Sequence, residues 1–154
     1  MGGSYSFGTM TIHILKLCVG VDDIGDLAAW QKKRAAQRKA AGEKHLCIHR
    51  TRMMPKRVDE LLDGGSLYWV IKGVIRVRQR LKAIEAGRRD DGTACAVLAL
   101  DRKLVRTMPK LMRPFQGWRY LEPQAAPIDL GEAGAAIAKM PPAMVEELRT
   151  LGLL

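Results

Sequence analysis

The sequence has few aromatic residues, no long apolar run and only three cysteines, and each shortage argues against a class of protein. Phe, Trp and Tyr make up 5% of the 154 residues, so we expect aliphatic side chains and Met to fill most of the core. No apolar run approaches the roughly 18 residues of a membrane-spanning helix, and His13 and Lys16 interrupt the best signal-peptide candidate. Cys18, Cys47 and Cys95 lack CxxC spacing. This odd set argues against a disulfide framework and favours a reducing compartment.

Motifs of the common nucleotide-binding and hydrolase families are also missing. The sequence has no GxSxG, P-loop or GxGxxG, and its Gly-Gly-Ser at 64–66 is too short for a phosphate loop. Asp59, Glu60 and Asp63 are the candidates for acid–base chemistry because Asp59 and Asp63 share one helix face. A solvated helix face explains them more simply. We therefore assign no catalytic residue and favour a noncatalytic protein.

A metal site has one candidate segment. In a strand, alternation places His45, Cys47 and His49 on one face, and imidazole and thiolate are zinc ligands. His13, Cys18 or water would have to complete the set. The spacing matches no known zinc finger, and a buried cysteine with flanking histidines explains it more simply. We therefore expect neither metal nor another cofactor.

Positive charge is abundant and concentrated in the middle of the chain. The formal net charge is +10. Residues 30–120 contain 23 Lys and Arg against 8 Asp and Glu, whereas the rest contains 3 and 8. A basic middle between acidic ends predicts a polyanionic partner, either a phosphate backbone or an anionic lipid surface.

Hydrophobic periodicity predicts an α+β fold. We expect a small twisted, mostly antiparallel sheet or a partly closed β-barrel with a long N-terminal helix, a short central helix and a C-terminal helix. The helix expected first begins after Asp22 or Asp23 and runs to about Ala41. The other expected elements are strands over 11–19 and 45–51, a helix over 55–64, a hairpin around 85–93 leading to a strand over 94–100, loops and short strands over 101–130, and a helix from 141.

The stretch 66–81 is the most informative segment. Its odd positions are mainly apolar, whereas its even positions become basic toward the end. Successive side chains of a strand alternate between faces, so we predict one apolar and one basic face. Gly73 is expected to mark a bulge or a bend, although helical spacing after Val77 leaves a helix open.

The chain is expected to form one domain with two appendages. We predict a disordered Gly/Ser-rich extension over 1–9, a single basic α+β domain over 10–130, and an Ala-rich tail with the C-terminal helix over 131–154.

Basic and aromatic residues of the middle segment form the candidate binding site. Arginine forks match phosphate oxygens, and aromatic rings stack on unpaired bases. The alternative is a solvated strand face, with the RPFQGWRYL segment (113–121) acting as an aromatic clasp that packs a proline-rich crossover. The expected nucleic-acid-binding residues are Arg52, Lys56, Arg57, Lys72, Arg76, Arg78, Arg80, Arg113, Gln116, Trp118, Arg119 and Tyr120.

Several long phrases resemble a known family. They are LKLCVGV (15–21), DLAAWQ (26–31), TRMMPKR (51–57), ELLDGGSLYWVIKGVI (60–75), VRQR (77–80) and RPFQGWRYL (113–121). Together they resemble the bacterial family catalogued as domain of unknown function number fourteen eighty-nine, best known from alphaproteobacteria, over 10–130. The resemblance implies a bacterial cytoplasmic protein, and because the family has no settled activity it does not indicate a mechanism. The order of elements is also similar to PUA-like and ASCH-type small β-barrels, which commonly bind RNA or modified nucleotides.

The expected function is noncatalytic binding of nucleic acid, with RNA or a modified nucleotide favoured over duplex DNA. An enzyme acting on a phosphorylated small molecule or nucleotide is the first alternative, and it requires one deep pocket containing Gln79, Gln116 and an acid. An adaptor for an acidic protein, docking through the terminal helix, is the second. Association with an anionic membrane is the third.

Overall fold

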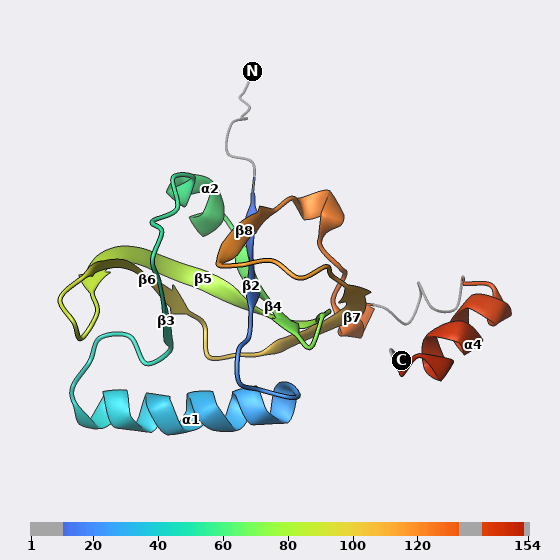
Figure 1. Cartoon of the computed structure of the whole chain (residues 1–154), viewed down its shortest axis with the longest axis horizontal. Helices are drawn as coiled ribbons and strands as arrows, with labels where there is room; N and C mark the ends of the chain where they lie inside the picture. Colours follow the sequence, from blue (N-terminus) through green and yellow to red (C-terminus); the bar gives the residue numbers. More distant parts are fainter. Residues whose placement is uncertain (1–10, 133–139, 153–154) are drawn as a thin grey trace, which may run out of the picture.

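The computed structural model describes residues 11–132 and 140–152 (Figure 1). The extension expected to be disordered, 1–9, lies outside the described residues. Within the described chain, no helix combines the length and apolar character needed to cross a bilayer.

Seven strands form one open, mostly antiparallel sheet, so the α+β prediction is confirmed. The strands are β2 (His13–Leu17), β3 (Ile48–Thr51), β4 (Ser66–Ile71), β5 (Val74–Arg88), β6 (Ala94–Leu100), β7 (Val105–Leu111) and β8 (Trp118–Leu121). Their order is β3-β6-β5-β4-β2-β8, and β7 also pairs with β5. Only β2 and β4 run parallel among these described pairs.

The stretch 66–81 is a hairpin and not one bent strand. Lys72 and Gly73 have positive φ angles of 51° and 78°, the backbone of a two-residue turn that suits right-twisted strands. The prediction of a bulge or bend at Gly73 therefore underestimated the change of chain direction, because the chain reverses there. Lys72 lies in the turn and not on the strand face. The stretch after Val77 is extended in β5, so the helical alternative is wrong.

Strand β5 is long enough to serve two halves of the sheet. Its first half pairs with β4 and β7, and its second half forms the expected hairpin with β6. The barrel does not close by strand pairing, because β3 and β8 remain the two ends of the strand order. Strands β3 and β8 do not pair with each other, so side chains have to provide any further closure between them.

Two of the helices flank the sheet. Helix α1 (Ile24–Ala40) begins after Asp23, whose carboxylate accepts a hydrogen bond from the Asp26 amide at 2.8 Å. This is the start that the sequence predicts from an N-capping aspartate. The short α2 (Val58–Leu62) precedes β4. Two single-turn helices follow β8, at Pro123–Ala125 and Leu130–Glu132. Helix α4 (Pro142–Thr150) has no buried residue and lies apart from the sheet (Figure 1).

The two faces of the sheet carry separate apolar clusters. The first contains Ile14, Trp69 and Val77 and extends to Leu27 of α1. The second contains Leu15, Tyr68 and Val70 with Phe115 and Leu121. Alternation along β2 and β4 sends neighbouring side chains to opposite clusters. The sheet thus has an α1 face and an opposite face, which separates side chains that are adjacent in sequence.

A buried amide connects α1 to the sheet. Gln79 of β5 is 0% exposed. Its Oε1 accepts hydrogen bonds from Gln31 Nε2 and Trp69 Nε1, both at 2.8 Å, and its Nε2 donates to the Asp101 carbonyl at 2.9 Å. A fully bonded buried amide fixes a geometry, because any displacement leaves polar atoms unpaired. Gln79 therefore holds α1 at a defined position over the first cluster.

Candidate functional site

Three adjoining hollows lie on the α1 face, between α1, the ends of β2 and β3, and β8. The helix-side hollow contains Trp30 and Arg34 and shares His49 with the apolar hollow and Arg50 with the edge hollow. The edge hollow has a volume of about 510 Å³ and the apolar hollow about 410 Å³. Because these hollows share lining residues, they form one continuous depression, here called the basic cleft.

The charge of the basic cleft is strongly one-sided. It is lined by six basic side chains and one acidic side chain, Asp90. Within residues 11–132 and 140–152, only Arg38 of the six forms an ion pair, with Glu43 at 3.9 Å. The six are Lys16, Arg34, Arg38, Arg50, Arg52 and Arg89. Five unpaired cations around one depression favour an anionic ligand.

Helix α1 supplies one wall. Trp30, Arg34 and Arg38 follow one another at intervals of four, so they lie on one side of the helix. The Arg34 guanidinium stands 5.6 Å from the centre of the Trp30 ring, which is within the range of a cation–π interaction. Arg38 donates from Nε to the His45 carbonyl at 2.6 Å and so joins α1 to the segment before β3.

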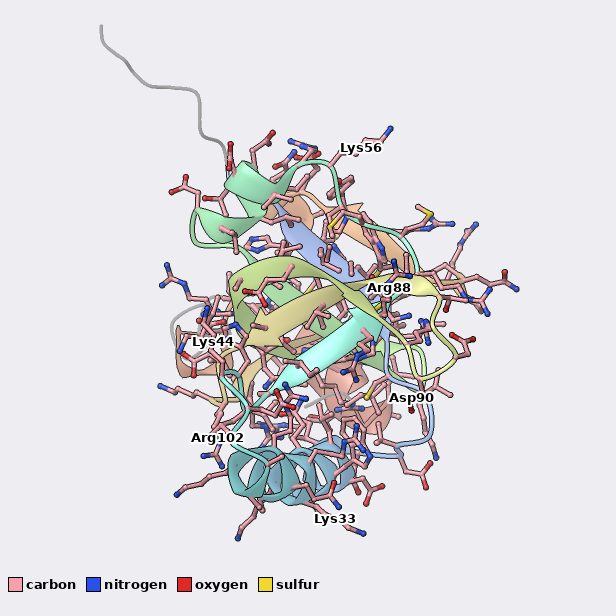
Figure 2. The ribbon with its side chains drawn as sticks, turned by 90° about the vertical axis from the view of Figure 1, so that its left-hand side faces the viewer. Lys33, Lys44, Lys56, Arg88, Asp90 and Arg102 are labelled. Atoms are coloured by element: carbon pink, nitrogen blue, oxygen red, sulfur yellow. The ribbon has the colours of Figure 1, made fainter. Side chains whose placement is uncertain are left out.

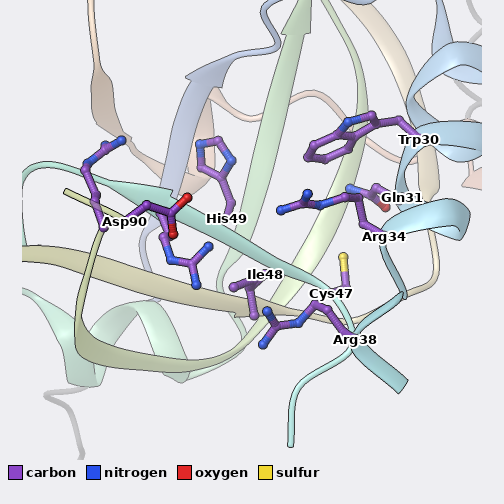
Figure 3. Close-up of a pocket in the computed structure, with 10 residues that line it drawn as sticks. Trp30, Gln31, Arg34, Arg38, Cys47, Ile48, His49 and Asp90 are labelled. Atoms are coloured by element: carbon purple, nitrogen blue, oxygen red, sulfur yellow. The ribbon is translucent and has the colours of Figure 1, made fainter. Parts of the chain in front are cut away.

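The sheet supplies the floor. Lys16 of β2 is in register with Trp69 of β4 on one side and with Trp118 of β8 on the other. The His49 ring of β3 meets Trp69 edge to face with centroids 5.1 Å apart. Figure 3 shows His49 across the helix-side hollow from Trp30. A cation of β2 and rings from four other segments thus meet at the same place.

The floor carries unused hydrogen-bonding capacity. His49 Nε2 and Arg89 Nε are buried and have no partner within the described residues. Burial, with the nearby charges of Lys16 and Arg89, lowers the pKa of His49 to about 4, so its imidazole is neutral at pH 7. Burial also lowers the pKa of Lys16, with a smaller contribution from Arg89. An anion bound here would relieve the mutual repulsion of these cations.

An aromatic clasp closes the gap between the two sheet edges. Trp118 Nε1 donates to the Met53 carbonyl at 3.0 Å. The Tyr120 hydroxyl accepts from the backbone amides of Lys56 and Arg57 at 2.9 and 3.1 Å. The two rings pack edge to face at 4.9 Å. Side chains of β8 therefore hold the segment after β3 where strand pairing is absent.

Three residues of the predicted set line the basic cleft together. Arg52, Gln116 and Trp118 all border the edge hollow, and Arg52 and Gln116 are exposed. Lys56 and Tyr120 lie next to it in the clasp. Figure 2 shows that Lys56, Lys44 and Arg102 project outward from the face that carries β3 and β6, so the positive field extends beyond the cleft.

The arginines of β5 lie on the opposite face. Arg78 forms a two-pronged ion pair with Asp129, with both nitrogen–oxygen distances 2.7 Å, and also donates to the Ser66 hydroxyl. Arg80 shares its side of the strand by alternation, whereas Arg76 lies at the irregularity between Ile75 and Val77, where the strand register shifts. The predicted strand face and the Trp118–Tyr120 pair therefore do not converge on one surface. Because successive side chains of β5 point to opposite faces of the sheet, Arg78 and Arg80 lie on the face opposite to Trp69.

Other predicted residues have partners of their own. Lys72, in the β4–β5 turn, pairs with Asp22 at 3.2 Å. Arg57 pairs closely with Glu60 and stands 5.4 Å from the centre of the Tyr120 ring. Arg119 lies 5.4 Å from the Phe115 ring centre, on the opposite face. Arg113 is exposed.

The remaining candidates for chemistry are dispersed. Within the described residues, no group of three or more His, Cys, Asp and Glu side chains is arranged to hold a metal ion. Cys47 Sγ accepts a long hydrogen bond of 3.6 Å from Gln79, and all three cysteines are free. Gln79 is buried and does not line the hollow that contains Gln116. The combination required by the enzyme alternative is therefore not assembled.

Sequence reasoning missed much of the cleft. Lys16, Trp30, Arg34, His49 and Arg89 were not in the predicted set. A signal existed for two of them, because Trp30 and Arg34 share one helix side with Arg38 in the order W-x₃-R-x₃-R. Lys16 and Arg89 reach the cleft only through β2–β8 pairing and the β5–β6 hairpin, and no local pattern predicts that meeting.

A family model described as "Protein of unknown function (DUF1489)" matches residues 14–154. The match includes the tail after 130, which the sequence phrases did not cover. No curated protein and no solved structure matches the chain. The likeness to PUA-like barrels is not shown.

Proposed function

The chain belongs to the DUF1489 family, and because membership carries no activity, we propose from the cleft itself that the protein binds single-stranded nucleic acid, RNA in particular. The observation that carries the proposal is the gathering of five basic side chains, with no ion pair among the described residues, around one continuous depression. The binding is noncatalytic, and the ligand's phosphates supply the negative charge that the cleft lacks.

The phosphate backbone would follow the exposed cations. Arg50 in β3 and Arg52 just after it line the edge hollow together with Arg89 of the β5–β6 hairpin. Guanidinium groups bond phosphate oxygens through two parallel N–H donors. Arg50 and Arg89 line both the edge hollow and the helix-side hollow, so one backbone can run through both.

The shape of the cleft favours a single strand. Hollows of about 260 to 510 Å³ have the size of sites for small molecules, and they accept individual nucleotides more readily than a rigid duplex. Trp30, exposed to 49%, offers a ring on which an unpaired base can stack. Gln116 offers both donors and acceptors for a base edge.

Asp90 favours RNA over DNA. A carboxylate gains nothing from phosphate, but it accepts a hydrogen bond from a hydroxyl group. The ribose 2′-OH is such a donor, and proteins use it to distinguish RNA from DNA. In Figure 3 the Asp90 side chain faces the same hollow as His49. We therefore expect RNA to bind more tightly than DNA of the same sequence.

The direct test is a fluorescence anisotropy titration of the full chain with a labelled single-stranded RNA at several salt concentrations. If three to five phosphates are neutralised, the slope of log K against log salt is expected to be about −2 to −3.5. Undetectable binding at low salt, or a flat salt response, contradicts the proposal.

Parallel titrations separate this ligand from other polyanions. Inorganic polyphosphate and vesicles containing phosphatidylserine present anions without bases. RNA is expected to bind more tightly than polyphosphate of equal charge. Equal affinity for polyphosphate, or preferential flotation with the vesicles, would identify a general anion-binding surface and contradict the assignment to RNA.

A further inference from the structure

The apolar hollow differs in character from the rest of the cleft. Apart from Lys16, its lining is uncharged and mostly apolar, and it includes the rings of Trp30 and Trp69. Val19 on its rim is 88% exposed. An apolar hollow with exposed rim residues, adjoining a basic depression, is unfavourable in water unless a ligand covers it.

The lining residues remain uncharged at neutral pH. Burial raises the pKa of the Cys18 thiol to about 11, and the His49 imidazole is neutral for the reasons given above. Gly20, at φ +87°, allows the chain to turn sharply after β2, with nothing within 4 Å of the position a Cβ would occupy. The entrance beside Val19 is therefore open.

From this juxtaposition we propose that the apolar hollow receives one unpaired base of the bound strand, beside the Trp30 ring, while Lys16 holds the adjoining phosphate. Lys16 lines both the apolar hollow and the edge hollow. Its ammonium group can therefore contact the phosphate next to a base that occupies the apolar hollow. This inference rests on the proposed function and adds a dedicated site for one base to it.

The walls suit a planar, hydrogen-bonding ring. Arg34 lines the helix-side hollow but not the apolar one, so it leaves the apolar side of the Trp30 ring open for stacking. His49 Nε2, which has no partner within the described chain, provides one hydrogen-bonding position for a base edge. An aliphatic group would satisfy the apolar wall but would leave this nitrogen unpaired.

The test compares two ligands of equal charge: a labelled RNA and the same ribose-phosphate chain without bases. Base stacking on an aromatic ring contributes enough to affinity that Trp30→Ala is expected to weaken RNA binding about tenfold. The same variant is expected to leave binding of the abasic chain within about twofold, because no base is lost. Trp30→Phe, which retains a planar ring, is expected to recover most of the loss.

Two controls make the result specific. Leu111→Ala removes a 65% exposed apolar side chain of β7 that lines none of the three hollows, and it should change neither affinity. Arg50→Gln should weaken binding of both ligands by the same factor. A 2-aminopurine base in the RNA should be quenched on binding to the wild type and less so by Trp30→Ala.

The outcomes distinguish the two proposals. If the wild type binds RNA and the abasic chain equally, or if Trp30→Ala weakens both by the same factor, the base site is wrong while anion binding stands. If the wild type binds neither ligand at low salt, the proposed function itself is wrong.

Discussion

The side-chain amides of Gln31 and Gln79 form a reciprocal pair of hydrogen bonds, 2.8 Å in one direction and 2.9 Å in the other. Gln31 belongs to α1 and Gln79 to the centre of β5, 48 residues apart. The pair sets the position of α1 on the sheet, and α1 carries Trp30 and Arg34 at the cleft. The shape of the cleft therefore depends on a buried polar contact.

Replacing Gln79 with Ala is expected to lower the free energy of unfolding by about 2–4 kcal/mol. The variant leaves the Trp69 indole N–H and the Gln31 amide without their buried partner and also opens a cavity. Urea denaturation of wild type and variant measures the difference. Gln37→Ala, a glutamine exposed on the same helix, is the matched control and should change stability by less than about 0.5 kcal/mol. A loss for Gln79→Ala below 1 kcal/mol would contradict the anchoring role.

The separation of the arginines between two faces gives a second prediction. Arg50 lines the cleft, whereas Arg80 is exposed on the opposite side of the sheet. If single-stranded RNA binds in the cleft, Arg50→Gln should reduce the steepness of the log K against log salt plot by about 0.7, as expected for one lost phosphate contact. Arg80→Gln carries the same change of charge and should leave the slope unaltered. Equal effects of both variants would show that binding follows net charge and not the cleft.

Local patterns predicted most elements of the fold because the relevant signals are local. Asp23 begins α1, Gly64 and Gly65 follow α2, and the Asp-Gly pair at 91–92 lies in the β5–β6 turn. The error at Lys72 has a physical cause. The alternation of apolar and polar residues looks similar on both sides of a two-residue turn and of a bend. This alternation was the basis for predicting the strand, so it could not distinguish the two.

The site was harder to predict because it depends on distant pairing. Arg52, Gln116 and Trp118, all in the expected set, line the same hollow, and their neighbouring phrases are both basic and aromatic. Arg78 was expected at the same site because it is basic and belongs to a predicted strand. The face of the sheet on which a residue lies depends, however, on its partners across the sheet. The nearest partner of Arg78 is Asp129, 51 residues away, which no period in the sequence connects to it.

The buried imidazole of His49 gives a prediction about pH. Its pKa is about 4 in the folded protein, against an ordinary value of 6.5, so the unfolded chain binds the proton more readily. Stability attributable to this group is complete above pH 6.5 and is lost as the pH falls toward 4. The shift corresponds to about 3 kcal/mol at most.

His49→Gln should therefore flatten the pH dependence of the unfolding free energy between pH 6.5 and 4, as measured by urea denaturation at a series of pH values. NMR titration of the His49 ring should give a midpoint near 4. A midpoint near 6.5, or an unchanged pH profile in the variant, would show that the ring is accessible to water.

The Arg78–Asp129 ion pair predicts a separate loss of stability in acid. Hydrogen bonding to Arg78 holds the pKa of Asp129 below its ordinary value of 3.8, so the contribution is present above that pH and is lost as the pH falls through the lowered pKa. Asp129→Asn should reduce the unfolding free energy at pH 7 by about 1–3 kcal/mol, because it removes the carboxylate that pairs with a partly buried guanidinium.

The difference between Asp129→Asn and wild type should shrink as the pH falls below 3.8 and through the lowered pKa of Asp129, where the folded wild-type carboxylate becomes protonated. Asp59→Asn, at an exposed helix position without an ion pair in the described chain, is the control and should behave as wild type. RNA affinity should be the same for both variants, since neither side chain lines the cleft. Weakened RNA binding in Asp129→Asn would place the ligand on the opposite face.

The clasp between β8 and the segment after β3 gives the last prediction, which connects the fold to the cleft. Tyr120→Phe removes only the hydroxyl that accepts hydrogen bonds from the Lys56 and Arg57 amides, and it retains the ring that packs on Trp118. Two backbone donors then have to find water. We expect the variant to lose about 1–2 kcal/mol of stability and the 53–57 segment to exchange its amide hydrogens faster.

The consequence for binding separates a clasp from a ligand contact. If Tyr120 only positions the strand edge that carries Arg52, Tyr120→Phe should weaken RNA binding modestly and by the same factor for RNA and the abasic chain. If Tyr120 instead stacked on a base, Tyr120→Phe should leave the affinity for RNA unchanged, because Phe retains the ring. Tyr68→Phe removes a hydroxyl on the opposite face and is the matched control. Hydrogen exchange that is unchanged over 53–57 in Tyr120→Phe would mean that strand β8 does not hold this edge, and the cleft would then lack a fixed wall on that side.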